Sequence, residues 1–174
     1  AQYRQVTGKA ALRTVDAGRG GDEMKQAEIG KIFSNAVYEV FEKMYYVFLE
    51  ARERPAPQLR ERALSISFSG PSSGTIGVYF SEALTGQMMR NSLNLDPEEA
   101  AEELRQDCLK ECLNMICGDF LQGYNPERLF QMSLPRYYES PAEAGLVRDG
   151  EKTWAMCFDA GDGGYFEGIL KMDG

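Results

Sequence analysis

The chain has 174 residues, of which 43% are hydrophobic and 26% charged, and this predicts one soluble globular domain. The net charge is −8, with 27 acidic against 19 basic residues, and residues 1–25 carry a net +2 within it. Such an acidic chain argues against binding to nucleic acid or to anionic membrane surfaces. No apolar run approaches the ~20 residues that a membrane-spanning helix needs.

The N-terminal part divides into an irregular segment and a long helix. Residues 1–25 show no apolar periodicity and are predicted to be a loose lead-in to a domain that covers residues 26–174. Apolar residues then recur at spacings of three and four from Ile29 to Phe48, which predicts an amphipathic helix of about six turns. The prolines within residues 53–58 are expected to end it.

A hairpin and two further helices are predicted in the middle of the chain. Residues 63–81 alternate in hydrophobicity around a Gly/Pro/Ser turn, and this turn is a better reading of the glycines than a phosphate-binding loop, because no GK[ST] follows. A short helix is expected over residues 82–93. Asp96 is the predicted N-cap of the next helix, which has Pro97 in its first turn and runs to about Leu121.

The C-terminal third has the residue pattern of strands. Residues 127–139 predict a strand that is interrupted at Pro135, and residues 152–172 predict two strands around a glycine-rich turn. That turn has aspartates suggestive of a calcium loop but lacks the remaining ligands, so a turn alone is favoured. The predicted fold class is therefore α+β, with two long helices and a short helix packed on an antiparallel sheet.

Four cysteines and the absence of histidine limit the possible chemistry. Cys108 and Cys112 lie one helical turn apart and are conceivable as two metal ligands, but the chain offers too few partners for a metal site. We expect all four, which also include Cys117 and Cys157, to be buried free thiols in a reducing cytoplasm. Without histidine, Ser-His and Cys-His nucleophilic mechanisms are excluded.

Three polar side chains recur on one edge of the long helix. At about 100° per residue, Asp107, Glu111 and Asn114 fall within a sector roughly 60° wide that borders the apolar face. Gly118, one turn further, is expected to leave space beside them. An ordinary solvated helix face is one interpretation. However, asparagine is a poor helix former, so its place in mid-helix favours a functional role.

The pattern Asp107-x3-Glu111-x2-Asn114 resembles the signature of the CheC/CheX/FliY phosphatases of bacterial chemotaxis. The segments NAVYEVFEKM, FSGPSSGTIGVYFSEALTGQMM and FEGILKM resemble this family's opening helix, hairpin with short helix, and closing strand, so that the resemblance covers about residues 26–172. CheC-type members repeat the motif on both long helices. The first helix here has only Asn35-x3-Glu39-x2-Glu42, with glutamate in place of the amide, and this resembles CheX.

The resemblance implies hydrolysis of the aspartyl phosphate on a CheY-like response regulator. Asn114 would orient the attacking water, Glu111 would pair with a lysine of the regulator, and Asp107 and Gly118 would contact the partner. It further implies that this chain binds no cofactor, that magnesium is bound by the regulator, and that the protein is cytoplasmic and forms a homodimer by joining sheets. Two alternatives remain: a non-catalytic regulator-binding or flagellar-switch-like adaptor of the same fold, and a purely structural domain.

Overall fold

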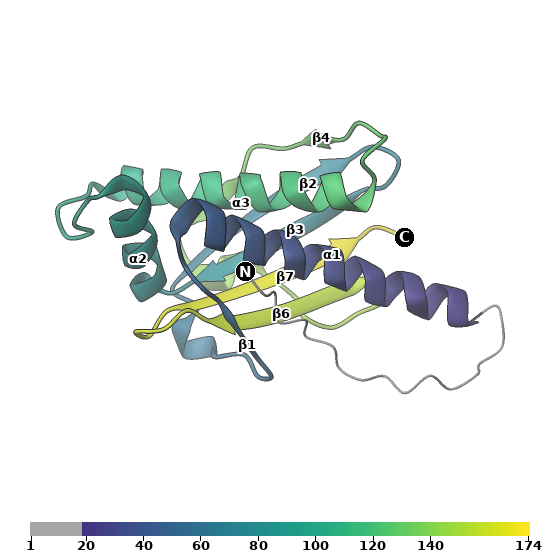
Figure 1. The fold of residues 1–174 in the computed structure, drawn as a ribbon, viewed down its shortest axis with the longest axis horizontal. Coiled ribbons are helices and arrows are strands. Elements are labelled where there is room, and N and C mark those ends of the chain that lie inside the picture. Colours follow the sequence, from purple (N-terminus) through teal and green to yellow (C-terminus); the bar gives the residue numbers. More distant parts are fainter. Residues whose placement is uncertain (1–18) are drawn as a thin grey trace.

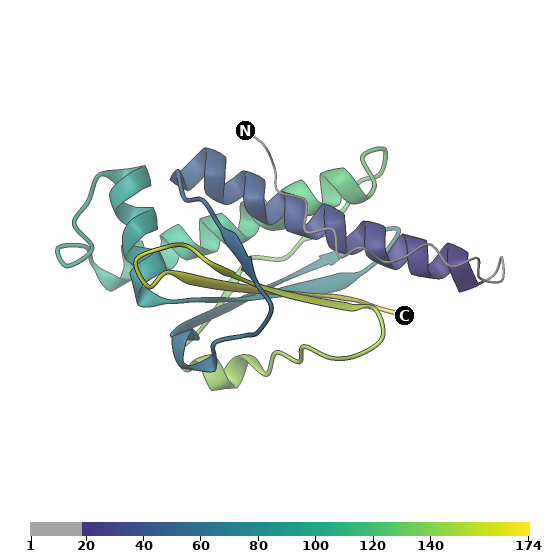
Figure 2. The same cartoon turned by 60° about the horizontal axis from the view of Figure 1, so that its bottom comes forward.

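A computed structural model describes residues 19–174, and the side chains from residue 25 onward. Three helices cover one face of an antiparallel sheet, so that the molecule has two main layers (Figures 1 and 2). This confirms the predicted α+β class. The helices are α1 (Arg19–Tyr45), α2 (Glu82–Leu93) and α3 (Glu102–Tyr124). The strands are β1 (Glu50–Arg52), β2 (Arg62–Ser69), β3 (Gly74–Phe80), β4 (Gln131–Met132), β5 (Arg136–Tyr138), β6 (Thr153–Asp159) and β7 (Tyr165–Met172).

The sheet has the order β1-β6-β7-β3-β2-β4, and β5 also pairs with β2. Both predicted hairpins are confirmed: β2 pairs with β3, and β6 pairs with β7. β3 and β7 form the centre of the sheet, and the whole of β3 pairs with residues 166–172 of β7. The predicted interruption at Pro135 is also confirmed, because β4 ends before this residue and β5 begins after it.

The hydrophobic core lies between the helices and the sheet. The rings of Phe41 and Phe166 are 4.9 Å apart, and those of Phe80 and Phe166 are 5.3 Å apart, which joins α1 to the two central strands. The rings of Phe33 and Phe120 meet edge to face at 6.0 Å and join α1 to α3. Such aromatic pairs favour fixed geometries, and they hold the two long helices against the same part of the sheet.

The first helix begins and ends earlier than the sequence predicts. It starts at Arg19 and stops at Tyr45, whereas the apolar periodicity predicted a helix continuing to Phe48. Tyr46 has a positive φ of 53°, which turns the chain out of the helix, and residues 50–52 then pair with β6 as an edge strand. Phe48, placed by periodicity on the buried stripe, is 72% exposed. Of the predicted lead-in over residues 1–25, residues 1–18 lie outside the described residues, and residues 19–25 belong to α1 instead.

The start of the third helix also differs from the prediction. Asp96 does not cap it; its Oδ1 accepts a hydrogen bond from the Glu98 backbone N–H at 3.1 Å and so stabilises a separate turn. The helix begins at Glu102, after Ala101, whose side chain makes no capping bond. It ends at Tyr124 rather than near Leu121. An Asx turn and an N-cap use the same side-chain chemistry, and the sequence alone did not distinguish them.

Two loops cover the face of the sheet opposite the helices (Figure 2). Glu167 of β7 is fully buried there, and its carboxylate accepts two hydrogen bonds from Arg60, at 2.7 and 2.8 Å. Arg148 Nε lies 2.8 Å from the same carboxylate, and the Tyr165 hydroxyl donates to it at 2.8 Å. This buried charge cluster fixes both loops to the sheet. The loops therefore cover the face opposite the helices and do not cover the helices themselves.

Candidate functional site

Asp107, Glu111, Asn114 and Gly118, which together are called the ribbon, lie on the outer side of α3. Asp107 and Glu111 are exposed, while Asn114 and Gly118 are partly buried. The opposite side of the helix is packed into the core through Cys108, Leu109, Cys112, Leu113, Ile116, Cys117, Phe120 and Leu121. The structure therefore brings all four predicted site residues together on one accessible edge of a helix whose backbone is held by packing.

The polar side chains of this ribbon have no partners among the described residues. Neither Asp107, Glu111 nor Asn114 forms a side-chain hydrogen bond or ion pair there. Gly118 has open space around it, since a Cβ atom added to it would meet nothing within 4 Å. Packing against the described residues therefore does not require a glycine at this position. The carboxylates and the carboxamide keep their full capacity for hydrogen bonds to another molecule.

Arg62 holds the beginning of α3. Its side chain is 6% exposed, and it donates to Glu82 at 2.6 Å and to Glu102 at 2.6 and 3.0 Å. These bonds join β2 to the first turns of both α2 and α3. The Arg62 hydrogen bonds are the main reason that the pKa of Glu102 is lowered. At the other end of α3, the rings of Phe120 and Tyr124 are stacked 5.6 Å apart.

Cysteines of α3 pack against α1. Burial raises the pKa of Cys108 to about 11 and that of Cys117 to about 12, and it raises the pKa of Cys112 well above its ordinary value. The pKa of Tyr45 is also raised, chiefly by burial, with smaller contributions from Cys112, Cys108 and Glu111. All four cysteines are buried and free, as predicted. Thiols with raised pKa values stay protonated at neutral pH and are poor nucleophiles.

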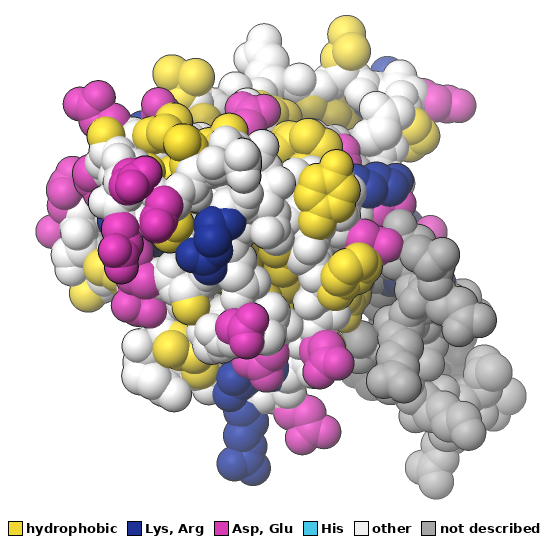
Figure 3. Space-filling view, turned by 60° about the vertical axis from the view of Figure 1, so that its left-hand side comes forward, with side chains coloured by type: hydrophobic (Ala, Val, Ile, Leu, Met, Phe, Trp, Pro, Cys, Tyr) yellow, Lys and Arg dark blue, Asp and Glu magenta, His cyan; other side chains and the backbone are white. Residues whose placement is uncertain are grey.

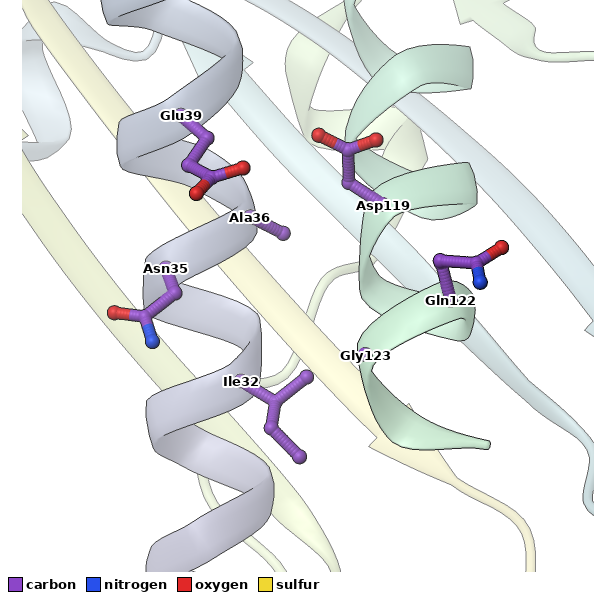
Figure 4. A pocket seen from close by; sticks show the side chains of 7 residues that line it. All are labelled: Ile32, Asn35, Ala36, Glu39, Asp119, Gln122 and Gly123. Atoms are coloured by element: carbon purple, nitrogen blue, oxygen red, sulfur yellow. The ribbon is translucent and has the colours of Figure 1, made fainter. Parts of the chain in front are cut away.

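A groove between α1 and α3 was not predicted from the sequence. It has a volume of about 310 Å³ and is lined by Ile32, Asn35, Ala36, Glu39, Asp119, Gln122 and Gly123. In Figure 4, Glu39 of α1 and Asp119 of α3 face each other across it. The pKa of Asp119 is raised by burial and by Glu39, while Lys43 opposes this shift. The only sequence signal was the four-residue spacing from Gly118 to Gln122.

The α1 residues at the corresponding spacing also face outward. Asn35 is exposed, and Glu39 and Glu42 are partly buried. Glu39 is 3.5 Å from Lys43 in an exposed pair one helical turn apart. The two helices thus present similar ribbons, but the third position is a carboxylate on α1 and a carboxamide on α3.

Among the described residues, no three histidine, cysteine or acidic side chains are grouped closely enough to hold a metal ion. Within the same part of the chain, none of the helices has the length and hydropathy that crossing a membrane requires. Acidic side chains gather where α2 and α3 meet (Figure 3). The exposed acidic residues in this region are Asp96, Glu98, Glu99, Glu102 and Glu103.

Comparison with protein-family models matches residues 63–158 to the family described as chemotaxis phosphatase CheX. The match spans more than half of the chain. The chain belongs to the CheX family. The matched region contains α3 and therefore the whole ribbon, whereas α1 lies outside it. A comparison with curated proteins gives no match.

Solved CheX structures share this fold at low sequence identity. The chemotaxis protein CheX from Vibrio vulnificus superposes with a TM-score of 0.69 at 20% identity, covering 85% of this chain and 98% of that one. CheX in a complex with CheY, BeF3 and Mg²⁺ from Borrelia burgdorferi has a TM-score of 0.65 at 15% identity, covering 82% and 96%. The FliM middle domain from H. pylori has a TM-score of 0.53 at 13% identity, covering 90% and 93%.

Proposed function

We propose that this CheX-family chain hydrolyses the aspartyl phosphate of a phosphorylated, CheY-like response regulator. The observation that carries the proposal is the ribbon on α3. There a carboxamide and a carboxylate, Asn114 and Glu111, are accessible and form no side-chain hydrogen bond or ion pair with the part of the chain that the structure describes, on a helix that is anchored along its opposite side. The family is one of chemotaxis phosphatases, and a structural neighbour is a CheX–CheY complex.

Asn114 is assigned the positioning of the attacking water. In phosphoryl transfer the protein mainly places the reactants and stabilises charge. The water oxygen forms a bond to phosphorus while the bond from phosphorus to the aspartyl oxygen breaks, and the products are free aspartate and inorganic phosphate. A carboxamide both donates and accepts hydrogen bonds and remains neutral beside the phosphoryl group, which suits it to hold this water in line.

Glu111 is assigned to a lysine of the regulator. A charged contact next to the reacting group sets the register between the two proteins. Asp107 supplies a further polar contact at the same edge. Gly118 leaves room for the docked partner, consistent with the open space around it. Magnesium is proposed to arrive bound to the regulator, and no step is assigned to a metal held by this chain.

The lifetime of the phosphorylated regulator tests the proposal. A CheY-type regulator, selected by pull-down with beryllofluoride, is phosphorylated and its decay followed with and without this protein. The wild-type protein should shorten the lifetime, and Asn114→Ala should not, although it should still bind the beryllofluoride-activated regulator. An unchanged lifetime with wild-type protein would instead favour the non-catalytic adaptor. The fold shared with the FliM middle domain is compatible with that alternative.

A homodimer and a cytoplasmic location belong to the same proposal. β1 pairs with β6 only along residues 157–159, so that residues 153–156 of β6 have one partner strand, β7, within the described part of the chain. Such an edge can pair with another copy. The predicted terminal hairpin contributes only β6 to it, because β7 lies inside the sheet. Light scattering over a concentration series tests whether the protein dimerises.

A further inference from the structure

The groove between α1 and α3 offers a second place for contact on the helical face. Its floor is apolar, with Ile32 and Ala36 projecting from α1 toward α3 and Gly123 opposite them (Figure 4). Its mouth carries two carboxylates, those of Glu39 and Asp119. An apolar channel that ends between two carboxylates suits a long cationic side chain, because the stem can lie on the floor while its charge meets the acids.

The carboxylates at this groove are incompletely neutralised within the described residues. Lys43 is the cation beside them, and its pair with Glu39 spans 3.5 Å with both side chains well exposed to solvent. Exposed pairs of this kind are weak. Glu39 and Asp119 together with Lys43 leave one net negative charge, and the pKa of Asp119 is raised by burial and by Glu39 despite Lys43. A second cation in the groove would therefore be bound favourably, because it would neutralise the remaining negative charge.

The groove adjoins the ribbon. Gln122 follows Gly118 at a spacing of four on α3 and also lines the groove, so the two surfaces meet at this residue. Along the helix axis, Asn114 and Gln122 are separated by about 12 Å, at 1.5 Å per residue. A standard interface buries about 800 Å² on each partner and so extends about 16 Å from its centre. A protein docked over Asn114 therefore reaches the groove.

We propose that this groove receives a lysine or arginine side chain of the response regulator that docks on the α3 ribbon. The inference rests on the proposed function, since it assigns a second anchoring point to the same partner. The ribbon would then act on the phosphoryl group, while the groove helps to select regulators that carry a basic residue at the matching distance. Specificity for one regulator would reside partly in α1, outside the ribbon that carries the chemistry.

The test removes both charges and keeps the side-chain shapes. Glu39→Gln combined with Asp119→Asn should weaken binding of the beryllofluoride-activated regulator about tenfold, and should raise KM more than it lowers kcat. The matched control, Glu53→Gln with Glu143→Gln, removes the same total charge from exposed residues in the loops on the other side of the sheet. It should change binding less than twofold. Equal effects of the two double variants would overturn the inference.

A basic-residue scan of the regulator identifies the occupant. One lysine or arginine, changed to alanine, should weaken binding to wild-type protein but have no further effect on Glu39→Gln/Asp119→Asn. If every such change is additive with the double variant, the groove does not hold a regulator side chain. Residues 1–18 provide an alternative occupant through Arg4, Lys9 and Arg13. If their removal tightens binding to wild-type protein but not to the double variant, the chain's own segment fills the groove and the inference is wrong.

These outcomes separate the inference from the proposed function. Wild-type protein that binds the activated regulator through the groove but leaves the phosphate lifetime unchanged would refute the phosphatase and support the docking site. Wild-type protein that hydrolyses the phosphate, with the double variant indistinguishable from its control, would do the reverse. A protein that neither binds nor hydrolyses would refute both.

Discussion

α1 and α3 lie side by side on the same face of the sheet, and each buries one stripe of large apolar side chains while turning a polar ribbon outward (Figure 1). Their ribbons have the same spacing, and the residues on them are similarly exposed. They differ at two positions: Asn35 stands on α1 where Asp107 stands on α3, and Glu42 stands where Asn114 does. At the third position, only α3 therefore has a carboxamide. If catalysis requires a neutral group to orient water, only α3 has a suitable side chain at the third position, although both helices expose a polar edge.

The largest effect is expected when the two helices are made alike at the third position. Asn114→Glu gives α3 the glutamate that α1 has at the third position, and it should lower the rate of phosphate hydrolysis at least about 100-fold, because a carboxylate repels the phosphoryl group and cannot donate a hydrogen bond. The decay of the phosphorylated regulator measures this. Asn91→Glu adds the same charge to an exposed position of α2 and should leave the rate within about twofold of wild type. Retained activity in Asn114→Glu would show that the carboxamide is not the feature that makes α3 differ from α1 in catalysis.

The contact between the helices should weaken at alkaline pH. Cys108 of α3 and Tyr45 of α1 belong to the same buried core, and burial raises the pKa of the Cys108 thiol from 9.0 to about 11. The folded state therefore binds this proton more tightly than the unfolded chain does. The resulting stabilisation is complete below pH 9 and is lost as the pH rises to about 11, at a cost of about 2 kcal/mol in the free energy of unfolding.

Urea denaturation at a series of pH values measures this loss. Other groups titrate in the same range, so the decisive quantity is the difference between wild type and Cys108→Ala. The free energy of unfolding of the variant should fall less steeply between pH 9 and 11. Parallel curves for the two proteins would show that ionisation of Cys108 does not affect the packing of α1 against α3.

Glu111 should matter less than Asn114 and in another parameter. Glu111→Gln removes the proposed charged contact with the regulator and should reduce kcat/KM about tenfold, mainly by raising KM. Glu103→Gln removes an exposed carboxylate in the first turn of the same helix and serves as its control. A loss confined to kcat would assign Glu111 to the chemical step rather than to binding.

The smallest effect is expected from equipping α1. In an Asn114→Ala background, Glu42→Asn completes the pattern Asn35-x3-Glu39-x2-Asn and should restore a few-fold increase in hydrolysis over the single variant. The gain is small because Glu39 faces Asp119 across the groove and remains paired with Lys43. If the double variant is as inactive as Asn114→Ala, spacing and a carboxamide are not sufficient to make a site on α1.

Much of the architecture was predictable because it depends on neighbours in sequence. Apolar spacing identified the long helices, and alternation with glycine-rich turns identified both hairpins. The ribbon followed from the geometry of a single helix, since residues at spacings of three and four share an edge wherever the helix packs. Gln122 continues this edge, but its spacing alone did not indicate that it borders a groove.

The ends of the helices depended on distant residues. α1 stops at Tyr45 because the following segment pairs with β6, more than a hundred residues later. The first turn of α3 is held by Arg62, which lies 40 residues earlier in β2. Local helix propensity gives no information about contacts between distant residues. For this reason Asp96 was predicted to cap α3, whereas it stabilises the preceding turn.

The amino-acid sequence by itself determined that three polar side chains would share one edge of a helix, and that no histidine would be available to act with them. Only the tertiary structure decided that this edge would be open to a partner, and that a second helix would lie beside it and form a groove. Exposure and grooves arise where separate elements pack against each other, whereas the period of a helix is a property of the local backbone.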